Sequence, residues 1–295
     1  MGLWFLFGLI CCLSPRPAEN APTSAEIPLR VMSFNIRYDN PADGENAWSH
    51  RRRVVADLIR AQDVDLVGVQ EALHHQLLDL QERLPDHTWF GVGRDDGRQA
   101  GEFTAIWYRH GRLELIEQGT FWLSETPDKP GLGWDAACPR TVTWGRFRDR
   151  FTRSVFVLFN THFDHYGQEA RRAGARLMRR RIGQIVAGDA VVITGDFNTP
   201  PDSEPIGILT EAAPDGPRLR DSAAVTTFPR QGPRGTFTGF RNDTPLSEPI
   251  DYIFLDENWI VTAHYTLADR PEGQYPSDHL PVLAVLHFVT SERRQ

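Results

Sequence analysis

The chain has 295 residues, of which 40% are apolar and 24% are charged, as in an ordinary globular protein. Its formal net charge is −7, which argues against a protein that holds long nucleic acid on a broad basic surface. A small phosphorylated substrate is not excluded, because a local arginine cluster is enough to bind it. The only cysteine after residue 25 is Cys138, so internal disulfides are excluded for that part of the chain.

The N-terminus holds the one candidate targeting segment. An apolar run from Leu3 to Leu13 is too short to span a membrane comfortably and has the length of a signal-peptide core. Thr23-Ser24-Ala25 supplies small residues for a cleavage site, whereas the absence of Lys or Arg before the run leaves a misplaced start codon as the alternative. Cys11 and Cys12 leave a lipoprotein anchor open. We expect residues 1–25 to be a signal peptide and the protein to be secreted or periplasmic.

Hydrophobic periodicity predicts a mixture of strands and helices. In chain order, the first part is predicted to form a strand over Leu29–Ile36, a polar loop over Asp39–Trp48, a helix over Arg51–Ala61, a strand over Asp65–Val69, a helix over Leu73–Leu84, and strands over Phe103–Tyr108 and Leu113–Trp122. The rest is predicted to form a loop over Ser124–Pro139, strands over Thr141–Phe147 and Val155–Asn160, a helix over Glu169–Val186, a strand ending at Asp196, a proline-rich segment over Pro200–Gly239, and strands over Ile250–Leu255 and Val282–Phe288.

These elements do not follow a strict alternation of strand and helix. Several strands are adjacent in the chain, which favours antiparallel neighbours. Two sheets packed face to face, with helices outside, accommodate the elements well and predict an α/β fold. No change in composition marks a linker, so we expect residues 26–295 to form a single domain.

The stretch from Val191 to Pro200 shows a pattern that recurs along the chain. A β-branched apolar run stops at a glycine and is followed by Asp196 and Asn198. An Asx turn that closes the strand is the ordinary alternative. Polar residues follow other strand-like runs in the same way, and together they are Asn35, Glu71, His162, Asp164, Asp196, Asn198, Asp251, Asp278 and His279.

The chemistry of this set predicts a bound cation. Four or five carboxylates that lie close together repel one another unless positive charge lies among them. The set is rich in oxygen and offers neither a cysteine nor a close histidine pair for zinc, which favours Mg²⁺, with Mn²⁺ or Ca²⁺ as alternatives. Magnesium held by few carboxylates is typical of phosphoryl chemistry, and histidines can donate hydrogen bonds to a phosphate or move a proton near neutral pH.

Six short segments in this order carry a resemblance to a known family. They are Ser33-Phe34-Asn35-Ile36, Gln70-Glu71, Asn160-Thr161-His162, Gly195-Asp196-Phe197-Asn198, Ile250-Asp251-Tyr252-Ile253 and Ser277-Asp278-His279-Leu280-Pro281. From about residue 30 to residue 288 the chain resembles the endonuclease/exonuclease/phosphatase superfamily, which has the deoxyribonuclease-I-like fold. The resemblance implies a four-layer α/β sandwich of two mixed sheets, and Mg²⁺-dependent cleavage of a phosphoester.

The resemblance also implies roles for individual residues. Glu71 would be the main metal ligand, with Asn35 beside it and Asp278 near the metal or the water. Asp196 would orient or deprotonate the attacking water, and Asn198 would hold the phosphate or that water.

For the two histidines the resemblance implies different positions. Asp251 and His279 would form a carboxylate–imidazole pair, and His162 would face the phosphate from the other side. In-line attack by water follows, because the sequence has no P-loop and no Ser or Cys nucleophile motif.

Further residues resemble a narrower, bacterial and mostly uncharacterised branch. Its motifs are closer to nocturnin-like and deadenylase-like members than to base-excision repair nucleases, which carry an acidic residue where this chain has Arg37. We expect Arg140 to bind substrate phosphate, with an exposed strand arginine as the alternative. Asp164 and His165 are further candidates for substrate binding, although a turn after a strand also favours these residue types.

The sequence therefore favours a metal-dependent phosphoesterase. Its expected substrate is a phosphorylated small molecule or a short nucleic acid, with no stable nucleic-acid partner and a monomeric chain. A sphingomyelinase-like or phosphoinositide-phosphatase-like enzyme at a membrane is one alternative. A non-catalytic binding module on the same fold is another, but it would not need Glu71, Asp196 and His279, and all three are present.

Overall fold

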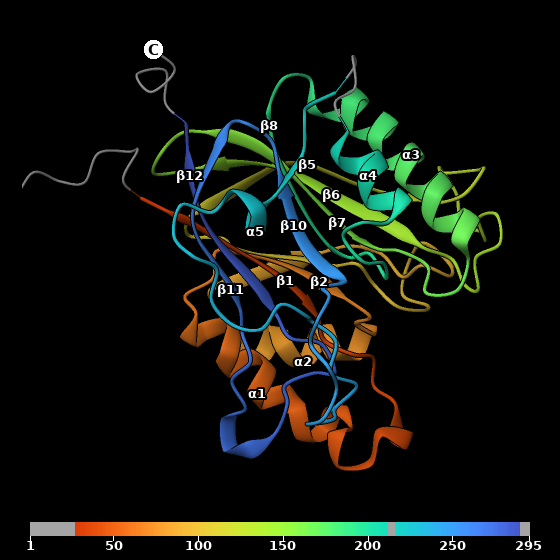
Figure 1. Ribbon diagram of the computed structural model, residues 1–295, viewed down its shortest axis with the longest axis vertical. Coiled ribbons are helices and arrows are strands. Elements are labelled where there is room, and N and C mark those ends of the chain that lie inside the picture. The colour runs from red at the N-terminus through yellow and green to blue at the C-terminus, as the bar shows by residue number, and fades with distance from the viewer. Residues whose placement is uncertain (1–26, 212–215, 290–295) are drawn as a thin grey trace, which may run out of the picture.

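Two six-stranded sheets pack face to face in the computed structural model, which describes residues 27–211 and 216–289 (Figure 1). In spatial order the first sheet consists of β11 (Trp259–Thr266), β12 (Val282–Phe288), β1 (Leu29–Asn35), β2 (Leu66–Gln70), β4 (Ile106–Arg109) and β3 (His87–Phe90). The second consists of β5 (Leu113–Trp122), β6 (Thr141–Asp149), β7 (Val155–His162), β8 (Ala190–Asp196), β10 (Asp251–Leu255) and β9 (Arg220–Asp221). The predicted leader, residues 1–25, lies outside the described residues.

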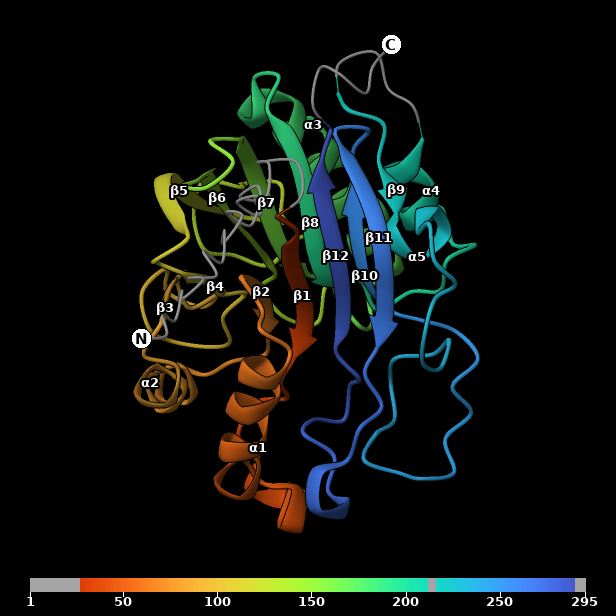
Figure 2. The ribbon, with the colours of Figure 1, turned by 90° about the vertical axis from the view of Figure 1, so that its left-hand side faces the viewer.

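Both sheets are mixed, as predicted. In the first sheet β1 runs parallel to β2 and antiparallel to β12. In the second, β8 runs parallel to β7 and antiparallel to β10. Figure 2 shows β12 between β1 and β11, with β2 on the far side of β1.

Helices cover the outer faces and complete the four layers (Figure 1). The helices are α1 (Trp48–Ala61), α2 (His74–Arg83), α3 (Gln168–Val186), α4 (Glu204–Thr210), α5 (Ser222–Val225) and the short 3₁₀ helices η1 (Pro41–Asn46) and η2 (Pro271–Gly273). One apolar core joins α1 and α2 to the first sheet, a second joins α3 and α4 to the second sheet, and a third lies between the sheets. Among the described residues no helix combines the length and apolarity needed to cross a bilayer.

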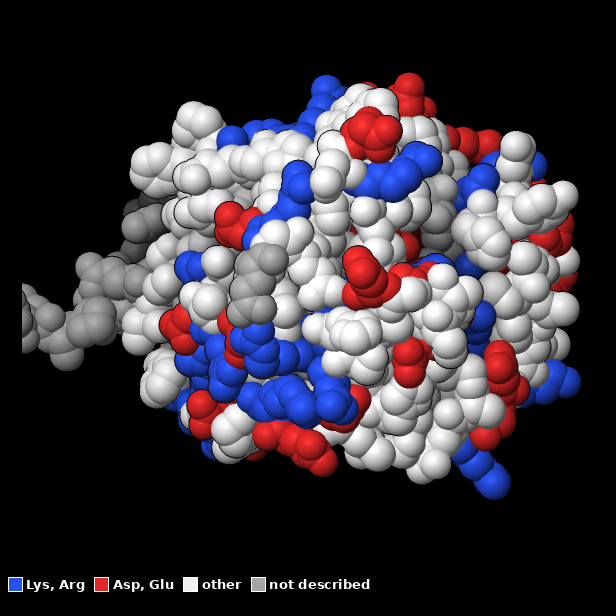
Figure 3. Space-filling model, turned by 90° about the horizontal axis from the view of Figure 1, so that it is seen from below, with Lys and Arg blue, Asp and Glu red and all other residues white. Residues whose placement is uncertain are grey.

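Arg52 and Arg53 on α1 reach solvent but are paired with acids. Arg52 lies 3.3 Å from Asp79, and Arg53 lies 3.0 Å from Asp57. Figure 3 views the molecule from below the α1 and α2 layer and shows basic side chains gathered at its lower left, with acidic ones among them. This face is therefore not a broad surface of one sign.

The structure adds elements that the periodicity did not predict. β3 has only four residues, and β11 carries a bulge between Val261 and Ala263 that interrupts its alternation. The proline-rich segment contains α4, where Pro205 lies in the first turn and removes no helical hydrogen bond. The strand predicted from Phe103 begins at Ile106, because Phe103 forms isolated bridges to other segments. The polar loop predicted over Asp39–Trp48 contains η1 and the first residue of α1.

A buried polar contact fixes the distance between the two sheets. Asn160 on β7 donates from Nδ2 to the carbonyl oxygens of Val69 (2.8 Å) and Ala105 (2.9 Å), and its Oδ1 accepts from Gln70 (2.6 Å). Close approach also requires Gly68, where a Cβ would lie 2.0 Å from the Thr194 hydroxyl oxygen. The sheets are thus held in one register next to the strand ends that carry the predicted site.

We predict that Asn160→Ala lowers the free energy of unfolding by about 1–3 kcal/mol, because it leaves buried polar groups without a partner. Urea unfolding followed by fluorescence measures the change. Gln118→Ala, at an exposed position of β5, is the control and should have little effect. Equal stability of the two variants would contradict the proposed role of Asn160.

Candidate active site

The strand registers bring the polar strand ends of the second sheet together. The parallel pairing of β7 and β8 places His162 opposite Asp196, and the antiparallel pairing of β8 and β10 places Asp251 opposite Asp196 from the other side. These three residues therefore lie in one row where the three strands β7, β8 and β10 end or begin. The row faces the end of β1, where Asn35 lies fully buried.

Asn35 connects this row to the first sheet. Its Nδ2 donates to Oδ2 of Asp196 at 2.9 Å and to Oε1 of Glu71 at 3.0 Å. Its Oδ1 accepts from the backbone N–H of Arg37 at 3.0 Å, which fixes the orientation of the amide. The carboxylates that follow β2 and end β8 thus meet at a single nitrogen atom.

The backbone is strained at three positions around this point. Arg37, Glu71 and Asn198 have positive φ angles of 57°, 63° and 50°, a region that side chains other than glycine rarely adopt. Such conformations cost free energy and persist where the surroundings require them. The Glu71 carboxylate accepts a hydrogen bond from the backbone N–H of Tyr38 at 3.2 Å.

Glu71, Asp196 and His279 form a group that could hold a metal ion. One ligand atom of each lies within 4.8 Å of the others. Burial, and then the neighbouring Asp251 carboxylate, raise the pKa of Asp196 to about 7. The neighbouring His279 and the Asn35 amide oppose this shift.

Asp278 lies beside this group and faces an arginine. Ser277 donates its hydroxyl to Oδ1 of Asp278 at 3.2 Å, and Nε of Arg37 lies 3.8 Å from Oδ2. The same guanidinium lies 3.9 Å from Glu71 and forms a closer ion pair with Asp43 at 3.0 Å. Burial raises the pKa of Asp278 although His279 and Arg37 oppose it.

His279 is held by an acid. Its Nδ1 lies 2.9 Å from Oδ2 of Asp251, and its Nε2 points back toward Oδ2 of Asp196 at 3.7 Å. Burial alone would lower its pKa, but Asp251 and Asp196 outweigh burial and hold the pKa well above its ordinary value. The exposed ring of Phe237 packs edge-on against the imidazole with ring centroids 5.0 Å apart.

His162 is held by a cationic side chain, that of Arg140, instead. Its Nδ1 lies 2.9 Å from Nη1 of Arg140, and its Nε2 lies 3.4 Å from Oδ2 of Asp196. Burial and then the Arg140 charge hold the pKa of His162 well below its ordinary value. Asn198 donates its amide to the Phe163 carbonyl at 3.1 Å and lies 3.0 Å from Nε2.

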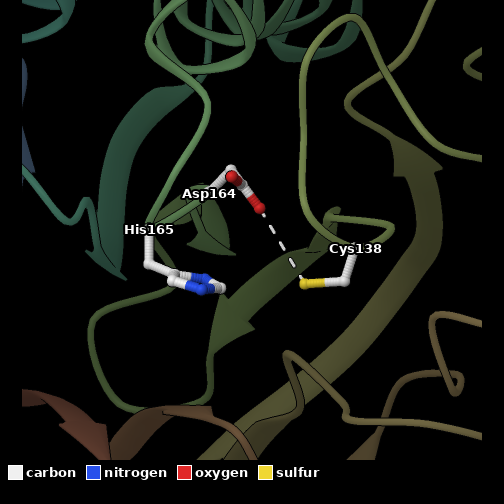
Figure 4. A group of neighbouring side chains, drawn as sticks. All are labelled: Cys138, Asp164 and His165. Carbon is white, nitrogen blue, oxygen red and sulfur yellow. Dashed lines mark hydrogen bonds between the residues drawn. The ribbon is translucent and has the colours of Figure 1, made fainter.

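The three predicted substrate-binding residues lie together behind His162. Arg140 is buried, and its Nε donates to Asp164 at 3.2 Å while Nη2 donates to Nδ1 of the exposed His165 at 2.8 Å. Figure 4 shows Asp164 pointing toward Cys138, whose Sγ lies 3.8 Å from Oδ2. Cys138, Asp164 and His165 are close enough to bind a cation. The Arg140 guanidinium, however, already donates to Oδ2 of Asp164 and to Nδ1 of His165.

Sequence reasoning missed Glu102. This residue lies in the loop between β3 and β4, and its Oε2 lies 2.6 Å from Arg94 and 3.9 Å from Nδ1 of His162. No strand-like run ends at Glu102, so the pattern that marks the other carboxylates is absent there. Burial raises its pKa although Arg94 opposes the shift.

The predicted residues thus occupy one site, with catalytic and metal candidates around Asp196 and substrate-binding candidates behind His162. The sequence profile of the Endonuclease/Exonuclease/phosphatase family matches residues 32–279, which is most of the chain. The chain belongs to this family. The resemblance inferred from the six short segments is confirmed.

Solved structures of family members have the same fold. An endonuclease/exonuclease/phosphatase from Bacteroides vulgatus is 40% identical, with 89% of this chain and 100% of that chain covered and a TM-score of 0.84. A mannosyl-6-phosphatase from Bacteroides thetaiotaomicron is 36% identical, with 88% and 100% covered and a TM-score of 0.82. The human nocturnin catalytic domain is 20% identical, with 89% and 94% covered and a TM-score of 0.68, and shares the fold. The bacterial relatives agree with the predicted bacterial branch.

We predict that Asp164→Asn destabilises the protein in a pH-dependent way. Burial would raise the pKa of Asp164, but the N–H groups of Gly167 and Ala137 and the Arg140 charge lower it to about 2. A depressed carboxyl pKa stabilises the fold above the ordinary value, and this contribution is lost as the pH falls toward 2. The variant should therefore lose roughly 2 kcal/mol at pH 7, at 1.36 kcal/mol per pKa unit.

Urea unfolding at pH 7 and pH 3 measures this change. The difference between wild type and Asp164→Asn should be smaller at the lower pH. Asp86→Asn, at an exposed position, is the matched control. A difference that grows on acidification would contradict the assignment.

Proposed function

We propose that the chain is a metal-dependent hydrolase that cleaves phosphate monoesters of small polar molecules such as sugars. The observation that carries the proposal is that Asn35, Glu71 and Asp196 meet between two histidines. One of these, His279, is held by Asp251, and the other, His162, is held by Arg140. The proposal is supported by the 36% identity to a mannosyl-6-phosphatase. It is also supported by the net charge of −7, which disfavours long nucleic acid as the substrate.

The donor set fits a hard divalent cation, with Mg²⁺ first and Mn²⁺ or Ca²⁺ as alternatives. Glu71 would hold the ion with Asn35 beside it, and Asp278 is a further candidate ligand. The raised pKa of Asp196 supports this fit, because a nearby cation would relieve the repulsion between the buried carboxylates. When bound, the ion neutralises charge on phosphate oxygens.

The side chains of the protein divide the remaining work. Asp196 accepts a proton from the attacking water. Asn198 orients this water or the phosphate. His279, held protonated by Asp251, donates to a phosphate oxygen from one side, and His162 donates from the other.

We predict that Glu71→Ala and His279→Ala fail in different ways. Glu71→Ala weakens metal binding first, so high Mg²⁺ should restore part of its turnover. His279→Ala lowers kcat by about 10² to 10⁴, and Mg²⁺ should not restore it. A Mg²⁺ titration of turnover separates the two, with excess EDTA abolishing activity of the wild type. Recovery of His279→Ala at high Mg²⁺ would identify the histidine as a metal ligand and contradict the proposal.

We predict that mannose 6-phosphate is hydrolysed with a higher kcat/KM than a phosphodiester. A monoester carries more negative charge at the phosphate, and His279, Arg37 and the cation supply the matching positive charge. The panel includes bis(4-nitrophenyl) phosphate, a short single-stranded oligonucleotide, and vesicles with phosphoinositides or sphingomyelin. Preference for a diester or a vesicle would replace the proposed substrate class, and no turnover at all would favour a binding module.

We propose, in addition, that the protein is exported and that the mature chain is a monomer. The apolar run from Leu3 to Leu13 and the small residues before residue 26 support the export of the mature chain. N-terminal sequencing and light scattering of the protein from its native host test the two statements.

A further inference from the structure

Arg140 has a polar partner at each of its three nitrogen atoms. Nε faces Asp164 at 3.2 Å, Nη1 faces Nδ1 of His162 at 2.9 Å, and Nη2 faces Nδ1 of His165 at 2.8 Å. The residue is 4% exposed, so solvent does not substitute for these contacts.

The contact with His162 has a chemical consequence. A guanidinium group has five N–H donors and no acceptor, and it keeps its proton in proteins. Nδ1 of His162 must therefore offer a lone pair, and the ring proton must lie on Nε2. An imidazolium at this position would direct one N–H group against another.

We infer that Arg140 is a positioning residue that holds the proton of His162 on Nε2, so that a neutral imidazole donates to the substrate phosphate opposite the charged His279. This inference rests on the proposed function of the site. Nε2 of His162 faces Oδ2 of Asp196 at 3.4 Å, on the side where the carboxylates meet. Nδ2 of Asn198 donates to the Phe163 carbonyl at 3.1 Å and also lies 3.0 Å from Nε2. Both ring nitrogens thus face a donor, and the positive charge of Arg140, against the neutral amide, places the ring proton on Nε2.

Arg140 is itself held in place by a fixed carboxylate. Asp164 accepts hydrogen bonds from the backbone N–H groups of Gly167 (2.7 Å), Tyr166 (3.0 Å) and Ala137 (3.2 Å). The acid thus belongs to a closed turn and orients Nε of the arginine.

Glu102 is the competing partner for the same ring atom. Its Oε2 lies 3.9 Å from Nδ1 of His162, farther than Nη1 of Arg140. Without the guanidinium, a proton on Nδ1 would face this carboxylate, and the tautomer with its proton on Nε2 would no longer be favoured. Arg140 therefore selects between two protonation patterns of one histidine.

The test compares wild type with Arg140→Met in ¹⁵N-histidine NMR spectra, with His162 assigned by its loss in His162→Gln. We expect an unprotonated Nδ1 and a protonated Nε2 in the wild type, and a protonated Nδ1 in Arg140→Met. Arg146→Met is the matched control, because Arg146 lies on β6, the strand that Arg140 directly precedes, and pairs with Glu117 outside the site.

Steady-state kinetics with the best monoester of the panel supply the second readout. A positioning role predicts that Arg140→Met lowers kcat by about 10² with little change in KM. A rise in KM with kcat preserved would show instead that Arg140 binds substrate, and would overturn the inference. Arg140→Lys should recover part of kcat, because an ammonium group also donates to Nδ1.

The spectrum of the wild type decides the inference even if Arg140→Met does not fold. A protonated Nδ1 in the wild type overturns the inference. If no phosphoester is turned over but Nδ1 is unprotonated, the proposed function fails while the assignment of the ring proton stands.

Discussion

One side-chain nitrogen joins the two sheets at the site. Nδ2 of Asn35 donates to Glu71 of the first sheet and to Asp196 of the second, at 3.0 and 2.9 Å. The contact requires the sheets to lie at one separation, which Asn160 and Gly68 set a short distance deeper in the core. Carboxylates from opposite sheets are thereby held close together, and their repulsion is what makes the site a strong candidate for a cation.

The electrostatics of the site are asymmetric around these carboxylates. Asp251 contacts Nδ1 of His279, whereas the Arg140 guanidinium contacts Nδ1 of His162. The Nε2 atoms of His279 and His162 both face Asp196, at 3.7 and 3.4 Å. The two histidines therefore differ, because the pKa of His279 is raised and the pKa of His162 is lowered. The inferred pair offers a cationic donor, His279, and a neutral donor, His162, for the equatorial oxygens of the phosphoryl group and for the leaving oxygen, on which negative charge builds up.

Much of this arrangement could be predicted from the sequence, because Asp196 and Asn35 follow apolar runs and strand registers bring such ends together. Glu102 could not be predicted, since its position depends on how a loop folds over the sheet edge. The side-chain direction of Arg140 could not be predicted either. An arginine between Pro139 and a strand looks the same in sequence whether it faces solvent or a buried histidine, and only the packing of the β7–α3 turn decides between them.

The central claim is that a cation and a phosphate bind between the two imidazoles. A crystal structure grown with Mn²⁺ and inorganic phosphate, with anomalous diffraction to locate the metal, tests it most directly. The account predicts an anomalous peak beside Glu71 and Asn35, and a phosphate within hydrogen-bond distance of Nε2 of both His162 and His279. A peak at Cys138 and His165, or a phosphate bound away from both imidazoles, would contradict it.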